Sequence, residues 1–219
     1  MKSQKQGDVE YKFSSDWTRR LESRRHWDYY WHQQKLMEGL VAPGHDDVLE
    51  IGVGSGFAAN YMKSKGFSVT TLDIDSEKAP DIVANVVTYD FQRKYSAILA
   101  FEILEHIPFD EFRRVVAKLP SVASRYAFIS LPRNVISLLD VAIKVPRLPE
   151  MRVRVPVKRR KIGTPSHHWE MDYGPYSVSR VEAILQSSGM SIIRRLVSGN
   201  IVFYALATFE GKESSGVAR

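Results

Sequence analysis

The stretch that decides the fold reads Val48-Leu49-Glu50-Ile51-Gly52-Val53-Gly54-Ser55-Gly56-Phe57. Its first residues are mostly apolar, as in a buried strand, and three closely spaced glycines follow at once. Glycine lets the chain turn tightly and lets a ligand approach the backbone. A helix that begins after the glycines would offer free N–H groups and a positive end to an anionic ligand group. The stretch therefore predicts a strand, a ligand-binding turn and a helix.

Strand-like and helix-like segments alternate along the chain around this stretch. We expect strands at 47–51, 68–73, 82–87, 95–101 and 125–131, with helices at 57–65 and at 110–119, the latter ended by Pro120. A helix at 26–40 precedes them, and a helix at 177–188 with strands at 191–197 and 201–209 follows them. Such an order predicts an α/β fold, a Rossmann-like seven-stranded, mostly parallel sheet with helices on both faces and a terminal antiparallel hairpin.

Four segments make up the expected domain organisation. Residues 1–44 form an N-terminal helical cap, 45–131 the ligand-binding core, 132–176 an insertion and 177–219 the helix and hairpin that complete the core. A connection as long as 132–176 is usually functional, and we expect a short helix at 135–144 within it. The cap helix carries Trp27, Tyr30, Trp31 and His32, which either cover the ligand cleft or pack on the sheet.

Composition limits the classes of protein that fit. The chain has 219 residues and no cysteine, which excludes disulfides and thiolate metal sites. Its first residues lack the apolar core of a secretory signal, and no apolar run approaches the length of about 20 residues that spans a bilayer. These features favour a cytoplasmic protein.

Positive charge is concentrated in the insertion. Residues 133–161 contain nine basic and two acidic residues, a net charge of +7, whereas the whole chain carries +6. We rank four interpretations: a lid over an acidic substrate, peripheral contact with an anionic membrane, a solvated loop, and contact with RNA phosphates. Nucleic acid comes last because no RNA-binding motif accompanies the charge.

An acidic partner for the glycine turn stands at the end of the next strand. Asp73 lies 21 positions after Gly52, where a carboxylate can accept hydrogen bonds from both hydroxyls of a ribose. The glycine spacing is G-x-G-x-G, whereas a dinucleotide fingerprint requires its third glycine at the position of Phe57. The spacing therefore argues against a nicotinamide dinucleotide as ligand.

With these residues and the run Phe101-Glu102-Ile103-Leu104-Glu105-His106, the chain resembles the class I S-adenosylmethionine-dependent methyltransferases over about residues 47–131. The fourth-strand run is similar to that of the small-molecule branch, which includes ubiquinone-type enzymes. The resemblance implies that the glycines hold the methionyl end of the cofactor, that Asp73 holds the ribose, and that Glu50 orients the loop and the methionyl ammonium. Asn85 stands at the adenine contact, where the family commonly has an acid. The implied cofactor-binding residues are Glu50, Gly52, Gly54, Gly56, Asp73, Ile74, Asn85, Val86 and Phe101.

The candidate catalytic residues are Glu102, His167 and His168. A base is needed only if the acceptor arrives protonated, and an imidazole or a cleft carboxylate suits that task. The alternative roles are an ion-paired carboxylate for Glu102 and a packed loop anchor for the histidine run. Glu105 and His106 are expected to join the strand to the next helix. We expect no metal, because the run 166–170 supplies too few converging ligands.

The predicted activity is methyl transfer to a small molecule, at oxygen before nitrogen or carbon, with S-adenosylhomocysteine as product. The alternatives are an RNA or protein methyltransferase and a non-catalytic S-adenosylmethionine-binding module.

Overall fold

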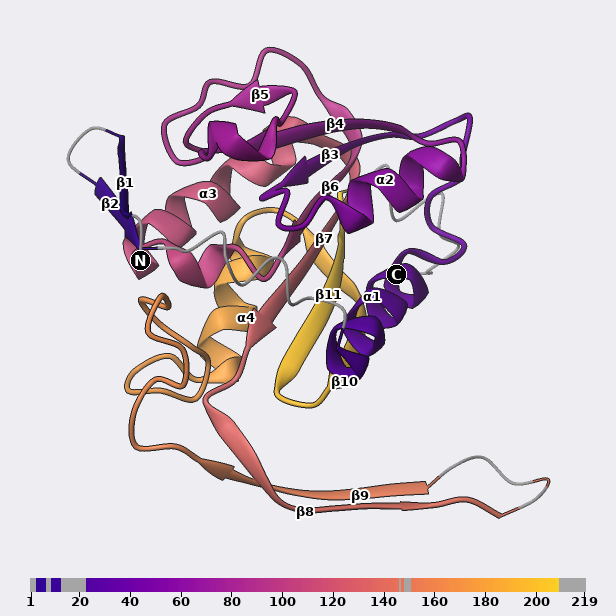
Figure 1. The fold of residues 1–219 in the computed structure, drawn as a ribbon, viewed down its shortest axis with the longest axis vertical. Coiled ribbons are helices and arrows are strands. Elements are labelled where there is room, and N and C mark those ends of the chain that lie inside the picture. The colour runs from indigo at the N-terminus through magenta and orange to yellow at the C-terminus, as the bar shows by residue number, and fades with distance from the viewer. Residues whose placement is uncertain (1–2, 7–8, 13–22, 146, 148–150, 209–219) are drawn as a thin grey trace.

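A seven-stranded sheet forms the centre of the molecule (Figure 1). The computed structural model describes residues 3–6, 9–12, 23–145, 147 and 151–208. The strands of the sheet are β3 (Asp47–Ile51), β4 (Ser68–Asp73), β5 (Ile82–Val83), β6 (Tyr95–Phe101), β7 (Ala123–Pro132), β10 (Ser191–Ser198) and β11 (Ile201–Ala207). Their order is β10-β11-β7-β6-β3-β4-β5. β3 to β7 pair in parallel, and β11 pairs antiparallel with both β7 and β10. The fold class predicted from the sequence is confirmed.

Helices cover both faces of the sheet. The helices are α1 (Arg24–Met37), α2 (Phe57–Ser64), α3 (Phe109–Val122) and α4 (Val178–Ser187), with 3-10 turns η2 (Ser76–Lys78) and η3 (Leu104–His106). α1 and α2 bury Leu36 and Met62 in one apolar cluster, and α3 and α4 bury Phe112 and Val181 in another. Two separate cores therefore hold the sheet from its two sides. None of the helices in the described ranges is long and apolar enough to cross a membrane.

Several observed element boundaries differ from the expected ones, and two of the differences have a clear structural cause. α3 does not end at Pro120 but continues to Val122, because the buried Leu119 and Val122 hold its last turn against the core. Pro120 removes one intrahelical hydrogen bond, and the burial of these two side chains offsets that loss. The third strand is only two residues long, because Asn85 accepts the Val87 N–H in a turn.

The insertion holds a hairpin where we expected a helix. β8 (Val135–Ile143) pairs antiparallel with β9 (Met151–Lys158), so the helix predicted at 135–144 is wrong. The segment is rich in β-branched residues, and a strand lets them alternate between two faces. Figure 1 shows this hairpin projecting away from the sheet as an extended arm.

The N-terminal segment is not wholly helical. β1 (Ser3–Gln6) pairs antiparallel with β2 (Val9–Lys12), whereas a helical cap was expected over 1–44. At the other end, the expected hairpin forms between β10 and β11, and Phe209 lies outside the described residues.

Candidate active site

The glycine turn follows β3 directly. Gly52, Gly54 and Gly56 all have positive φ angles, of 82°, 56° and 77°, a region that side chains disfavour. The turn is fixed by two hydrogen bonds, in which the Gly52 N–H donates to Leu72 O at 2.8 Å and the Gly56 N–H donates to Val53 O at 2.8 Å. A Cβ added at Gly54 would meet no atom within 4 Å. The turn is therefore rigid, and the protein leaves open the space above Gly54.

Asp73 connects the end of β4 to this turn. Its Oδ2 accepts the Val53 N–H at 2.8 Å and forms an ion pair with Lys78 Nζ at 3.0 Å, and its Oδ1 accepts the Asp75 N–H at 2.9 Å. The residue is only 4% exposed. Asp73 thus orders the turn and also presents a negative charge to the cleft beside it.

Glu50 is a buried acid below the turn. Burial, and then the negative charge of Asp73, raises the pKa of this carboxyl to about 8. Its Oε2 has no hydrogen-bond partner among the described residues. A buried carboxylate oxygen without a hydrogen-bond partner favours a cation or a donor at this point of the cleft.

An aromatic layer from α1 covers the turn. The ring of Tyr30 lies 4.2 Å from that of Phe57, and Trp27 meets Phe57 edge-on at 5.0 Å. The Tyr30 Oη and Ser55 Oγ lie 3.3 Å apart. One of the two expected roles of this helix, covering the cleft, is therefore compatible with the geometry.

These elements enclose one cleft at the carboxyl ends of β3, β4 and β6. The expected site residues that line it are Glu50, Gly52, Gly54, Asp73, Ile74, Asn85, Val86, Phe101 and Glu102. Gly56 does not line it and instead shapes the turn. Further lining residues that sequence reasoning did not place in the site are His26, Tyr29, Gln33, Lys78, Ile103, His106 and Ile107. His26, Tyr29 and Gln33 belong to α1, and no local sequence pattern joins this helix to the glycine turn.

Asn85 stands at the cleft wall with its side chain already engaged. Its Oδ1 accepts the Val87 N–H at 2.9 Å, and both it and Val86 are buried. This hydrogen bond holds the loop after β5 in a turn, so Asn85 presents a fixed polar edge where the resemblance implies the adenine contact.

Glu102 is a strained residue immediately after β6. It has a φ of 50°, which a non-glycine residue rarely adopts outside functional sites. Its N–H donates to Ser130 Oγ at 2.9 Å, and the Ser130 hydroxyl donates back to Glu102 Oε1 at 2.9 Å. Burial raises the pKa of the carboxyl to about 7, with a contribution from the charge of Glu170. Ser130 therefore holds in the cleft a carboxyl that can exchange a proton near neutral pH.

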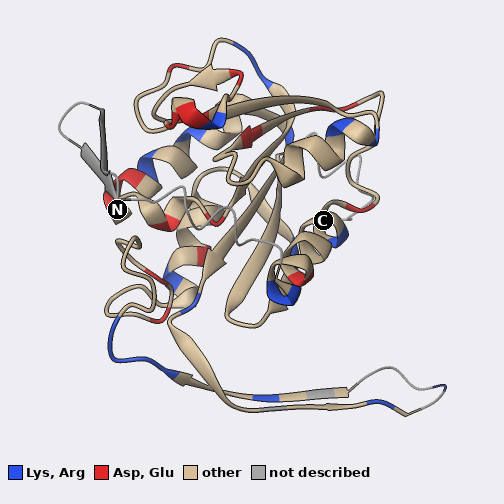
Figure 2. Ribbon diagram, viewed as in Figure 1, with Lys and Arg blue, Asp and Glu red and all other residues tan. Residues whose placement is uncertain are grey.

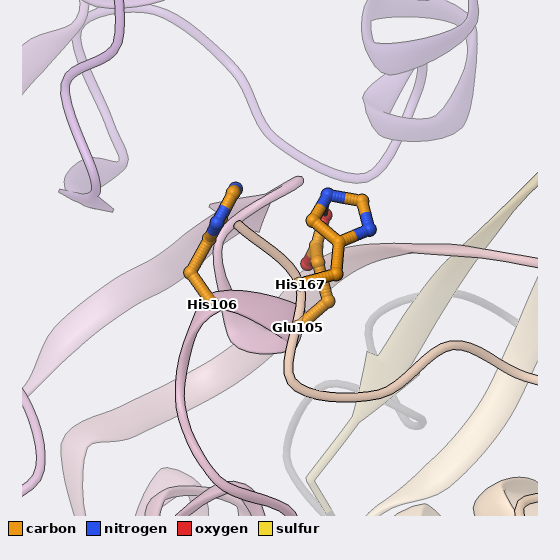
Figure 3. Close-up of side chains that lie close together, drawn as sticks. All are labelled: Glu105, His106 and His167. Carbon is orange, nitrogen blue, oxygen red and sulfur yellow. Dashed lines mark ion pairs between the residues drawn. The ribbon is translucent and has the colours of Figure 1, made fainter. Parts of the chain in front are cut away.

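A cluster of acids and histidines lies next to Glu102. The loop that carries His167 and His168 reaches η3, where the His168 N–H donates to Glu105 O at 2.9 Å. Figure 3 shows the imidazoles of His106 and His167 beside the Glu105 carboxylate. His167 is nearly buried and His168 is exposed, and neither is among the described residues that line the cleft. The structure thus brings Glu102, Glu105, His106 and His167 into one region and leaves His168 at its edge.

Burial shifts the titration of this cluster. It raises the pKa of Glu105 well above its ordinary value, with a further contribution from the charge of Glu102. It lowers the pKa of His106 to about 4, with a further contribution from His167. The imidazole of His106 is therefore neutral at neutral pH. Trp169, fully buried against Phe109 and Phe112, anchors the loop.

The cleft has the chemistry that S-adenosylmethionine requires. The cleft offers open space above Gly54 for a ligand that contacts the backbone. The Asp73 carboxylate can accept from a pair of hydroxyls, and the unpartnered Oε2 of Glu50 can receive a cation. The residues present therefore fit the cofactor that the sequence resemblance implies.

Comparison with known proteins agrees with this geometry. The sequence matches the family model described as a methyltransferase domain over residues 13–151. A search of curated protein sequences found no match.

Several solved structures share the fold. The N-methyltransferase NodS from Bradyrhizobium japonicum WM9, in complex with S-adenosyl-L-homocysteine, superposes with a TM-score of 0.59 at 10% identity, covering 87% of this chain and 91% of that one. The magnesium protoporphyrin IX methyltransferase ChlM from Synechocystis PCC 6803, with bound SAM, gives 0.55 at 14% identity, covering 90% and 86%. The glycopeptide N-methyltransferase MtfA gives 0.55 at 12% identity, covering 82% and 88%. At such identities the likeness shows the fold alone.

Proposed function

The chain belongs to the methyltransferase-domain family, and we propose that it transfers a methyl group from S-adenosylmethionine to the oxygen of a small-molecule acceptor. The observation that carries the proposal is the cleft above the glycine turn, with Asp73 and Glu50 on its wall. S-adenosylmethionine, when bound, supplies a methyl group already activated by its positive sulfur. The work of the chain is then to bind, to align the acceptor and to exclude water.

In this proposal, each wall of the cleft contacts one part of the cofactor. The glycine turn and Glu50 receive the methionyl end, Asp73 the ribose, and Asn85 and Val86 the adenine. Ile74 and Phe101 provide apolar contact beside them. Tyr30 and the rest of the aromatic layer exclude water from above, which strengthens every electrostatic contact inside.

Glu102 is the base we propose for an acceptor hydroxyl. It lines the cleft, Ser130 fixes its orientation, and its pKa of about 7 suits proton exchange near neutrality. His167 and His168 are weaker candidates, because neither is among the described residues that line the cleft. A nitrogen acceptor that arrives unprotonated would need no base, so the presence of Glu102 favours oxygen.

Calorimetry with S-adenosylhomocysteine and NAD tests the cofactor assignment. We expect binding of the former and none of the latter. In Asp73→Ala, affinity for S-adenosylhomocysteine should fall by about tenfold or more, because each charge-assisted hydrogen bond contributes roughly 1.5–3 kcal/mol. The matched control is Asp47→Ala at the opposite end of β3, where the carboxylate accepts the Ser96 N–H at 2.8 Å. This control should lower Tm and leave affinity unchanged, and NAD binding or an unaffected Asp73 variant would remove the assignment.

Methyl transfer itself separates the remaining alternatives. Turnover of labelled S-adenosylmethionine with any acceptor excludes a non-catalytic binding module. Binding to RNA that weakens steeply with salt would favour an RNA methyltransferase instead.

The β8–β9 arm supports a second part of the proposal, that the protein docks on an anionic membrane to reach its acceptor. Cross-strand pairing puts Leu139, Val141 and Ile143 opposite Val155, Val153 and Met151, and all six are 40–56% exposed. Opposite residues of an antiparallel pair share a face, so the arm presents one apolar surface. Figure 2 marks basic residues along the arm and at its base. An apolar face flanked by cations matches the interface of an anionic bilayer.

The arm fits less well the role of a lid over an acidic substrate, which ranked first among the four interpretations of the basic segment. It extends away from the sheet in Figure 1, and no residue of 133–161 is among the described residues that line the cleft. Two contacts tie the arm to the body. Midway along β9, Arg154 Nη1 donates to Gly199 O at 2.7 Å, and before β8 Arg133 pairs with Asp172 at 2.7 Å. The orientation therefore favours the membrane interpretation.

A further inference from the structure

Three side chains from two distant segments converge beside the cleft. One candidate ligand atom from each of Glu105, His106 and His167 lies within 4.8 Å of the other two (Figure 3). The two imidazole rings are 4.9 Å apart and nearly perpendicular, and His167 Nε2 lies 3.9 Å from Glu105 Oε1. The run 166–170 alone suggested too few ligands for a metal, and η3 supplies the rest.

Each imidazole is fixed through its Nδ1. His106 Nδ1 lies 3.2 Å from Ser166 O, and His167 Nδ1 lies 2.8 Å from Glu170 Oε1. A carbonyl can only accept a hydrogen bond, and so can an ionised carboxylate, so the hydrogen of each ring sits on Nδ1. The Nε2 of each ring is then a lone-pair donor. Metal-binding histidines in proteins are oriented in this way by a carboxylate or a carbonyl behind them.

The third side chain has no hydrogen-bond partner among the described residues. Glu105 is fully buried, and neither carboxylate oxygen accepts a hydrogen bond from another described residue. An ionised carboxylate without a partner at such a place costs several kcal/mol, and a bound cation removes that cost. This orphaned group is a second observation, independent of the spacing, that indicates a ligand.

We propose that Glu105, His106 and His167 bind a divalent transition-metal ion, Zn²⁺ or a close analogue. Two neutral imidazoles and one carboxylate form a donor set typical of zinc sites that keep a fourth position open. Ligand atoms around such an ion lie about 3.4 Å apart, which follows from metal–ligand distances of about 2.0–2.2 Å. Side-chain movements of about an ångström would bring the three atoms to that spacing.

The open coordination position of the ion can serve the methyl-transfer reaction, and this step rests on the proposed function. His106 lines the cleft, so an ion bound to it borders the acceptor's space. A metal ion lowers the pKa of a bound hydroxyl, which favours breaking the O–H bond of the acceptor. The proton would pass to the carboxylate of Glu102, and the oxygen would attack the methyl carbon with the electron pair that it keeps. The methyl–sulfur bond would break at the same time, its electron pair would stay on sulfur, and S-adenosylhomocysteine would leave.

Metal binding is tested on the full-length protein after treatment with a chelator. We expect one equivalent of Zn²⁺ to rebind in calorimetry and to raise Tm, because a ligand of the native state stabilises it. Co²⁺ should give the intense visible absorption of a four-coordinate site. Glu105→Gln and His167→Asn, which nearly preserve volume, should each weaken Zn²⁺ binding by at least tenfold. The exposed His45, on the loop before β3, provides the control His45→Ala, which should bind like wild type.

The same samples separate this inference from the proposed function. Each variant is first shown to be folded by its cooperative thermal transition, and His106→Asn replaces any that is not. If wild type binds S-adenosylhomocysteine but no Zn²⁺ or Co²⁺, the metal site is refuted and the methyltransferase proposal stands. If the variants bind Zn²⁺ as wild type does, the three residues are not the ligands. If wild type binds Zn²⁺ but does not bind S-adenosylhomocysteine, only the proposed function is overturned.

Discussion

At the scale of single residues, the most informative group is the buried carboxyl of Glu50. Its pKa of about 8 in the folded protein exceeds the ordinary value of 4.5, so folding favours the protonated form. Its contribution to stability is fully present below pH 4.5 and is lost as pH rises through about 8. Glu50→Gln mimics the protonated form. We expect the Tm of this variant to equal that of wild type near pH 5 and to exceed it at pH 9, measured by thermal denaturation without cofactor.

Ligand binding should reverse the preference of Glu50. An ammonium group beside the carboxyl favours its ionised form, so wild type should release a proton on binding S-adenosylhomocysteine at pH 7. Calorimetry in two buffers of different ionisation enthalpy measures this proton. Glu50→Gln should bind more weakly and release none. Equal proton release by the two proteins would place the ammonium elsewhere.

How well single residues could be predicted depended on how local their surroundings are. Glu50 lies directly before the glycine turn and Asp73 ends the next strand along the chain, so a local strand–turn pattern predicts both, and the structure places both on the cleft wall. His106 was assigned only a connecting role, because its neighbour His167 is 61 positions away and no local pattern joins them. A contact between two distant segments cannot be recognised from the amino-acid sequence of either segment alone.

At the scale of elements, the glycine turn offers a matched pair of substitutions. Gly54 and Gly44 both have positive φ, of 56° and 76°, and a Cβ at either would meet no atom within 4 Å. Gly54→Ala and Gly44→Ala should therefore lose similar stability, on the order of 1–2 kcal/mol, from the strained backbone alone. Only Gly54 lines the cleft, so only Gly54→Ala should weaken S-adenosylhomocysteine binding, by about tenfold or more. Equal affinities in calorimetry would show that the ligand does not approach Gly54.

The elements of the core and of the insertion differed in how predictable they were. Strands β3, β4 and β6 are short segments whose side chains are mostly buried, and their expected bounds match the observed ones. Seven of the nine residues of β8 are apolar, and the sequence of this segment alone is compatible with a helix. Its partner β9 decides the outcome, since cross-strand pairs such as Val141 with Val153 stabilise an extended chain. Strand pairing depends on the tertiary structure, so the local propensity of a segment does not predict it.

At the scale of the whole molecule, charge and apolar surface coincide on one projecting element. The body buries its apolar side chains in two clusters on either side of the sheet, whereas the arm leaves its apolar face exposed. Exposed aliphatic side chains in such numbers indicate an interaction surface rather than a solvated loop. The cleft and the arm are thus separate parts, so changes on one should leave the other working.

Charge reversal at the base of the arm, directly after β9, tests the proposed membrane role. Arg160→Glu with Lys161→Glu should weaken binding to vesicles of phosphatidylserine and phosphatidylcholine by about tenfold or more, since each basic residue near such a surface contributes about 1 kcal/mol. The control Lys94→Glu with Arg113→Glu changes the net charge equally on the exposed body and should bind nearly as wild type does. Affinity for S-adenosylhomocysteine should stay unchanged in both. Because exposed charges are screened over about 10 Å at 0.1 M salt, wild-type binding should also fall as salt is added.

The apolar face is tested separately by Val141→Ser with Val153→Ser, which should reduce vesicle binding without changing its dependence on salt. If light scattering instead shows a wild-type dimer that these serines dissociate, while vesicle binding is absent throughout, the arm joins two copies of the chain and the membrane role is refuted.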